Sequence, residues 1–143
     1  MFVLDTCAIS EAMSVQRNRN FTNWFASQKP DRLATTTITV TEIAHGLMRL
    51  PEGKRREELL RAVKTLFRSL HIYEQDKTSA WLAGEMIALE ERAGRTLKFA
   101  DAAIAAITLN NDGQLVTRDA DFEGVNRHDS FRRFQIINPW SEN

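Results

Sequence analysis

Five carboxylates occupy similar positions relative to the strands and helices predicted for this chain. Asp5 and Asp119 directly follow apolar strands, Glu42 and Asp101 open helical segments, and Asp121 lies two residues after Asp119. The functional crevice of an open parallel sheet lies beyond the carboxyl ends of its strands, so we expect these side chains to converge there. Two carboxylates ~4 Å apart repel by ~4 kcal/mol at an effective dielectric constant near 20, so such a cluster must take up protons or bind a cation.

The donor atoms of this cluster predict a hard metal ion. All five side chains offer oxygen, which Mg²⁺ and Mn²⁺ prefer, whereas a softer metal such as zinc normally requires a compact His and Cys set. The chain has three scattered histidines and one cysteine. The sequence therefore predicts an Mg²⁺ or Mn²⁺ site. We expect Asp5 and Asp101 to be direct ligands, Glu42 and Asp119 to bind a second ion or orient water, and Asp121 to be a further candidate ligand.

Each of these acids also has an ordinary structural interpretation. Asp5 and Asp119 could cap the turns that follow them, and Asp101 could be a helix N-cap. Asp121 could belong to ordinary turn chemistry with Asp119. Each interpretation is reasonable for one residue alone, but the recurrence of all the acids at one topological position favours a shared site.

Glu42 has two further interpretations. Thr39 to Glu42 matches the S/T-x-x-E capping box, in which Glu42 would only reach back to the Thr39 amide. Glu42 and His45 also have the Glu-x-x-His spacing of di-iron bundles, but that design needs two copies on facing helices and this chain has one. The capping box therefore remains the main alternative to a role in metal binding.

Length, composition and charge limit the possible classes of protein. The 143 residues, 43% of them hydrophobic, predict one domain spanning residues 1–143. Nineteen basic and nineteen acidic residues give a net charge of zero, so a nucleic acid must be bound by a local basic patch. The single cysteine, the absence of a signal-like N-terminus and the absence of an apolar run of about 20 residues lead us to expect a cytoplasmic protein that is not inserted in a membrane.

Apolar runs and helical periodicity alternate along the chain. We predict strands at 2–4, 33–36, 71–73, 114–117 and 134–137, and helices at 9–13, 18–28, 39–51, 54–70, 76–94 and 101–109. This alternation predicts an α/β fold with a parallel sheet and helices on both faces.

Five short motifs occur in a characteristic order. They are LDT at Leu4–Thr6, TVTEIAHGL at Thr39–Leu47, FADAAIAAI at Phe99–Ile107, LVTRDADFEG at Leu115–Gly124 and INPW at Ile137–Trp140. With these motifs in register over nearly the whole chain, the sequence resembles the PIN-domain ribonuclease toxins of the VapC type. The resemblance implies a PIN-like α/β/α sandwich with a short, mostly parallel central sheet flanked by helices.

The resemblance also implies an activity and partners. The activity would be Mg²⁺- or Mn²⁺-dependent cleavage of RNA leaving a 5′-phosphate and a 3′-hydroxyl. The partners would be an RNA substrate, a small cognate antitoxin and a second copy of the toxin within a toxin–antitoxin complex. Position by position, Asp5, Glu42 and Asp101 match the three principal acids, and Asp119 matches a fourth position that is often Asp or Asn.

Cys7 departs from the family pattern, because such toxins usually read Asp-Thr-Asn where this chain reads Asp-Thr-Cys. The same residue argues against an aspartyl-phosphate phosphatase, which would carry Asp-x-Asp after the first strand. A second alternative is a degenerate PIN domain that acts as a non-catalytic binding or regulatory module. Retention of every principal acid argues against that alternative.

An RNA backbone would need cations near the acids. By sequence adjacency the candidates are Arg17, Arg19, Arg49, Arg95, Lys98 and Arg118, whereas we expect Lys54, Arg55 and Arg56 to be a solvated helix surface. Single-stranded loops or bulges are better substrates than a regular A-form duplex, whose deep groove hides its bases.

Overall fold

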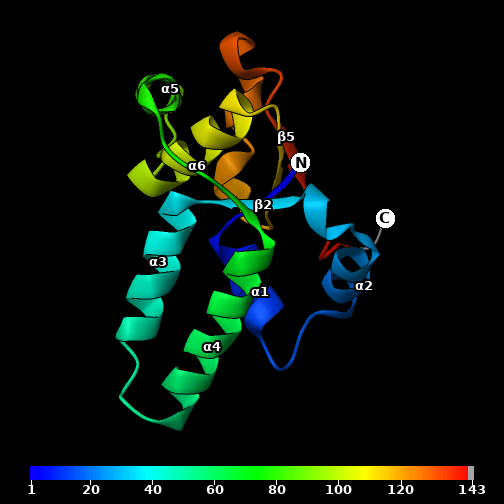
Figure 1. Ribbon diagram of the computed structural model, residues 1–143. Helices are drawn as coiled ribbons and strands as arrows, with labels where there is room; N and C mark the ends of the chain where they lie inside the picture. The colour runs from blue at the N-terminus through cyan, green and yellow to red at the C-terminus, as the bar shows by residue number, and fades with distance from the viewer. Residues whose placement is uncertain (142–143) are drawn as a thin grey trace.

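The computed structural model describes residues 1–141 and is built around one five-stranded sheet (Figure 1). The strands are β1 (Phe2–Leu4), β2 (Leu33–Thr36), β3 (His71–Tyr73), β4 (Gln114–Val116) and β5 (Gln135–Ile137). Their order is β3-β2-β1-β4-β5, and every neighbouring pair is parallel. The predicted strands are confirmed to within one residue. Residues 142–143, which the expected domain includes, lie outside the described residues.

Helices cover both faces of the sheet, as the alternation of apolar runs predicts. They are α1 (Thr6–Met13), α2 (Arg19–Ser27), α3 (Thr37–Met48), α4 (Lys54–Ser69), α5 (Lys77–Arg92) and α6 (Phe99–Asn110). Successive side chains of a strand point to opposite faces. Val3 of β1 accordingly packs in a core cluster with α5 and α6, whereas Leu4 packs in a second cluster with α1, α2, α3 and α4. Figure 1 shows α5 and α6 on one side of the sheet and α1 and α4 on the other. The predicted α/β/α sandwich is confirmed.

Helix α6 packs against both the sheet and α5, which explains its composition. All eight residues from Ala102 to Leu109 are buried. Four of them are alanines, whose small side chains allow the close approach of α5. Helix α6 leads into β4 and therefore runs antiparallel to the parallel strands. Its first turn consequently lies at the edge of the sheet where the β-strands end.

Three predicted helix starts are wrong. Helix α1 begins at Thr6, three residues before the predicted start at residue 9, and the other two errors concern candidate acids. Helix α3 begins at Thr37, and its N-cap is Thr36, whose side chain accepts from the Thr39 amide at 3.1 Å. Thr36 ends β2 and already has the extended backbone that an N-cap requires, so the cap precedes the predicted capping box. Helix α6 begins at Phe99 with Lys98 as its N-cap residue, so Asp101 lies inside the first turn. Neither Glu42 nor Asp101 is therefore an N-terminal capping residue.

Within residues 1–141, no helix combines the length and the apolar character needed to cross a membrane.

Candidate active site

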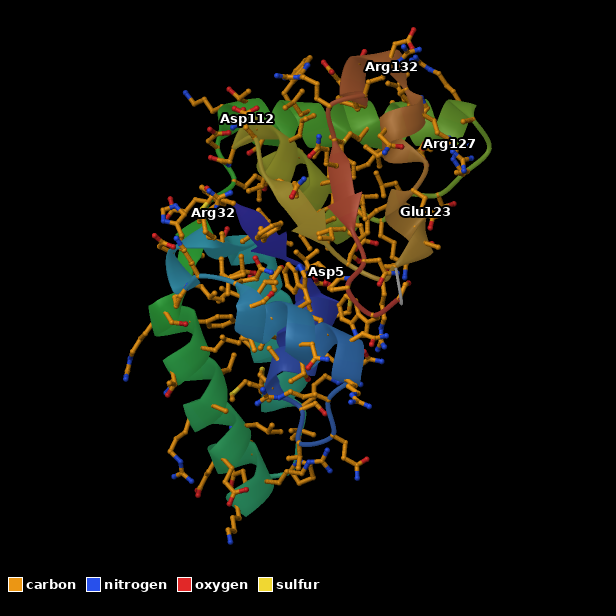
Figure 2. All side chains as sticks on the ribbon, turned by 90° about the vertical axis from the view of Figure 1, so that its right-hand side faces the viewer. Asp5, Arg32, Asp112, Glu123, Arg127 and Arg132 are labelled. Carbon is orange, nitrogen blue, oxygen red and sulfur yellow. The ribbon has the colours of Figure 1, made fainter. Side chains whose placement is uncertain are left out.

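Asp5 joins the end of β1 to the start of α1. Its Oδ1 accepts from the Ala8 amide at 2.8 Å, so it caps α1, as the structural interpretation predicts. The residue is only 4% exposed, and Figure 2 shows it near the middle of the molecule, away from the peripheral Arg32 and Arg132. Burial raises the pKa of the Asp5 carboxyl above its ordinary value, although hydrogen bonds from Cys7, Thr117 and Ala8 act in the opposite direction. Asp5 is thus both a helix cap and a buried acid at the carboxyl edge of the sheet.

Three other carboxylates form a compact group at the same edge. Asp101 lies in the first turn of α6, and Asp119 follows β4 and caps the 3₁₀ turn Ala120–Phe122. Asp119 Oδ1 accepts from the Asp121 amide at 2.9 Å, which turns the chain back on itself. Carboxylate oxygens of Asp101, Asp119 and Asp121 consequently all lie within 4.8 Å of one another.

The repulsion in this group acts most clearly on Asp101. Burial raises the pKa of the Asp101 carboxyl to about 6, and the negative charges of Asp119 and Glu42 add to the effect while Lys98 opposes it. Repulsion among carboxylates is what a bound cation relieves. The three acids of the compact group offer oxygen ligands alone, which fits a hard divalent ion such as Mg²⁺ or Mn²⁺.

Glu42 reaches the site from the second turn of α3. The hydroxyl of Thr6, the first residue of α1, donates to Glu42 Oε1 at 2.5 Å. This contact joins two packed helices, and the charge of Glu42 lies near enough to Asp101 to contribute to the raised pKa of that carboxyl. The capping-box interpretation of Glu42 is therefore wrong, because its carboxylate is engaged by α1 and the Thr39 amide is engaged by Thr36.

These residues line one pocket of about 530 Å³ at the carboxyl edge of the sheet. The predicted acids Asp5, Glu42, Asp101 and Asp119 are among its lining residues, and Asp121 joins them through the compact group. Two cations, Lys98 and Arg118, also line it. The guanidinium carbon of Arg118 lies 5.3 Å from the centroid of the Trp140 ring, a cation–π arrangement that restrains this long side chain.

The basic residues predicted to lie near the acids differ in where the structure places them. Of the six candidates, Lys98 and Arg118 line the pocket, as described above. Arg95 instead forms a bidentate pair with buried Glu90, at 3.0 and 2.9 Å. Arg55 is exposed, as predicted for a solvated helix surface, and it also lines a neighbouring cavity of about 410 Å³ together with Glu42. Helix α4 packs along α1 and α3, which brings Arg55 to this cavity.

Sequence reasoning did not assign Ser10 and Ser14 to the site, although both line the pocket. A signal was present, because Thr6, Ser10 and Ser14 follow one another at intervals of four residues after Asp5. Residues four apart share one face of a helix, so this spacing marks a hydroxyl-bearing face of α1 next to the acids.

Comparison with known proteins agrees with this geometry. Residues 2–127 match the PIN domain family. The plasmid stability protein StbB of Pseudomonas syringae pv. tomato is 34% identical over 98% of this chain and 99% of its own length. The VapC ribonuclease Y4jK of Sinorhizobium fredii is 29% identical over 98% of each chain. The crystal structure of FitAcB from Neisseria gonorrhoeae superposes with a TM-score of 0.80 at 26% identity, covering 99% of this chain and all of that one.

Proposed function

This chain belongs to the PIN domain family, and from that premise we propose that it is the ribonuclease toxin of a type II toxin–antitoxin system. The proposed reaction is Mg²⁺- or Mn²⁺-dependent hydrolysis of an RNA phosphodiester bond. The supporting observation is the compact group of Asp101, Asp119 and Asp121 beside buried Asp5, in a pocket that also contains Lys98 and Arg118. Clustered acids flanked by cations suit a phosphate held next to a divalent ion. The domain would span residues 1–143.

We assign the roles in this reaction by position. Asp101, Asp119 and Asp121 would hold the ion, and Asp5 would complete the ligand set from β1. When bound, the ion would supply the positive charge that activates water and stabilises the phosphate oxygens during in-line displacement. Lys98 and Arg118 would bind the phosphates on either side of the scissile bond, because both are free of carboxylate partners in the salt bridges of the described residues.

Glu42 has a separate role in this scheme. The Thr6 hydroxyl fixes its Oε1, and we assign Oε2 to orient the attacking water and to accept a proton from it. A carboxylate that is held by a neighbouring helix has little freedom to turn away, which is what a positioned base requires. The reaction needs no covalent intermediate with the enzyme.

The test of the activity is direct. Purified protein incubated with RNA in Mg²⁺ should cleave it to fragments with 5′-phosphates, and excess EDTA should stop cleavage. Asp101→Asn should be inactive while keeping its fold by circular dichroism. Undiminished cleavage in EDTA would exclude the metal mechanism, and absence of cleavage by the wild type in either metal would favour the alternative of a non-catalytic PIN module.

The toxin assignment rests on relatives and has its own test. The curated relative from Sinorhizobium fredii is named a VapC ribonuclease. By analogy this chain would act in the cytoplasm, form a homodimer and be neutralised by a small antitoxin. Expression of the chain alone should arrest growth, and co-expression of the adjacent small reading frame should relieve the arrest. Equal harmlessness of the wild type and Asp5→Asn at equal expression would contradict a toxin function.

A further inference from the structure

Phe99 is an exposed aromatic residue beside the candidate active site. It is the first residue of α6 and is 77% exposed, although a Phe is normally buried. Its chain neighbours Lys98 and Ala100 both line the catalytic pocket, as does Asp101 two residues later. Side chains of a helix lean toward its N-terminus, so the ring of Phe99 projects at the same edge of the sheet as the acids.

The surroundings of Phe99 do not form a broad apolar patch. Its sequence neighbours Thr96 and Lys98 are exposed and polar, and Leu97 between them is buried. The other exposed aromatic residue of this helix pair, Trp81, lies in the second turn of α5. The last residue of α6, Asn110, donates to Asp76, the N-cap of α5, at 3.2 and 3.3 Å, so the start of α5 faces the end of α6. Trp81 is five residues beyond Asp76, so it lies roughly 9 Å from Phe99 along the helix axes at about 1.5 Å per residue.

An isolated exposed ring next to a cation fits a nucleic acid better than an apolar protein surface. Proteins that bind single strands stack bases on exposed aromatic side chains and hold the adjacent phosphates with basic ones. Phe99 offers the ring, and Lys98, one residue away, offers the charge within the pocket. Stacking on a Phe ring is possible for every base, so this contact would add affinity without fixing the sequence.

We propose that Phe99 is a base-stacking residue of the substrate site, which binds an unpaired base of the RNA next to the phosphate held by Lys98. This inference rests on the proposed ribonuclease function and extends it to the substrate class. It requires a single-stranded substrate at this position, because a base within a duplex cannot present its face to a side chain. The compact acids then cut the strand one or a few nucleotides from the stacked base.

The test measures RNA binding separately from cleavage. Asp5→Asn serves as the background, because it should not cleave, and Asn also caps helices well. The probe is a fluorescein-labelled single-stranded RNA of random sequence in Mg²⁺, followed by anisotropy. Phe99→Ala should weaken binding by about 5- to 150-fold, and Phe99→Trp should retain it. In a matching RNA with 2-aminopurine in place of adenine, the 2-aminopurine fluorescence should be quenched on binding to the protein with Phe99 or to Phe99→Trp. Phe99→Ala should not quench it.

Salt dependence and a matched variant identify the contact. Phe99→Ala should leave unchanged the slope of the logarithm of RNA affinity against the logarithm of salt concentration. Lys98→Ala should reduce the steepness of this slope by about 1, as expected for the loss of one phosphate contact. Trp81→Ala removes an aromatic side chain that is 74% exposed in the second turn of α5, outside the pocket lining, and RNA binding should not change. Equal losses in Phe99→Ala and Trp81→Ala would overturn the proposal.

Two outcomes separate this inference from the function on which it rests. If the wild type cleaves RNA and Phe99→Ala binds RNA as tightly as its Asp5→Asn parent, the stacking role is wrong and the ribonuclease function stands. If Phe99→Ala instead changes the oligomeric mass by light scattering while RNA affinity is unchanged, Phe99 is a protein contact and the proposal is overturned. A wild-type protein that neither binds nor cleaves RNA contradicts the proposed function itself.

Discussion

The thiol of Cys7 lies 2.9 and 3.1 Å from the two carboxylate oxygens of Asp5. Both residues line the candidate active-site pocket, and the thiol donates to the carboxylate that also caps α1. A hydrogen-bond donor that serves the ionised form of an acid favours ionisation. The cysteine that departs from the family pattern therefore supplies a donor to the first acid, which an asparagine amide at this position would also be able to do.

The first prediction concerns the reactivity of this thiol. Burial, followed by the negative charge of Asp5, raises the pKa of Cys7 from 9.0 to about 12. The thiolate is the reactive form, so iodoacetamide should label Cys7 in the native protein roughly a thousandfold more slowly than in the unfolded chain at the same pH. Asp5→Asn should accelerate native-state labelling, measured by mass spectrometry. Native labelling as fast as unfolded labelling would show that the thiol is not protected.

The second prediction concerns the pH dependence of stability. The folded-state pKa of Asp101 is about 6, above the ordinary value of 3.8, so the folded protein holds this proton more tightly than the unfolded chain. Protonated Asp101 contributes its full stabilisation to the folded protein below about pH 4, and this contribution is lost as the pH rises through about 6. Asp101→Asn stays neutral and should be more stable than the wild type by about 1 kcal/mol at pH 7.5 without metal, since solvent screens this half-buried group. The difference should vanish near pH 4 in urea unfolding experiments.

A third prediction follows from adding the metal. Mg²⁺ or Mn²⁺ should raise the melting temperature of the wild type at pH 7.5, because an ion that binds only the folded state stabilises it. The shift should be absent in Asp101→Asn and reduced in Asp121→Asn. Asp112→Asn, at a residue that Figure 2 shows well apart from Asp5, should behave as the wild type. An equal shift in Asp101→Asn would exclude the compact acidic group as the metal site.

The fourth prediction separates capping from chemistry in α3. Glu42→Gln keeps the size of the side chain and should reduce cleavage steeply while changing the free energy of unfolding by less than about 0.5 kcal/mol. Thr36→Ala removes the true N-cap and should destabilise the protein by about 1 kcal/mol, with activity per folded molecule retained. The cleavage rate should therefore fall in Glu42→Gln, and the midpoint of urea unfolding should fall in Thr36→Ala. Normal cleavage by Glu42→Gln would remove Glu42 from the mechanism.

The fifth prediction concerns the segment that carries Asp119 and Asp121. Glu90 is 1% exposed and accepts from Arg95 and His128, and Gly124 lies directly against this cluster. A Cβ on Gly124 would lie 2.5 Å from both Arg95 Nε and Glu90 Oε2, so Gly124→Ala should destabilise the protein by about 1–3 kcal/mol.

The matched control for that substitution is Gly84→Ala. Gly84 lies inside α5, and a Cβ added there would meet no atom within 4 Å, so alanine should stabilise the helix by up to about 1 kcal/mol. Thermal unfolding of both variants should give shifts of opposite sign. A neutral Gly124→Ala would mean that the Glu90 cluster can move aside without loss.

The strands and most helices could be predicted because their signals are local. Phe2–Leu4 and Leu115–Val116 are apolar runs that a buried parallel strand requires, and the periodicity of 54–70 belongs to one helix face. Once alternating strands and helices are accepted, parallel topology places Asp5 and Asp119 at one edge. The sequence by itself therefore determined the fold class and the edge of the sheet that carries the acids.

Only the tertiary structure decided which of those acids are neighbours. Asp101 and Asp119 are brought together with Asp121 by the packing of α6 and by a single 3₁₀ turn, whose bend depends on a side-chain hydrogen bond. Likewise, whether Glu42 serves a helix end or meets Thr6 depends on where α3 begins and how it packs on α1. Contacts between residues far apart in sequence depend on packing at the scale of one ångström, and periodicity carries no information at that scale.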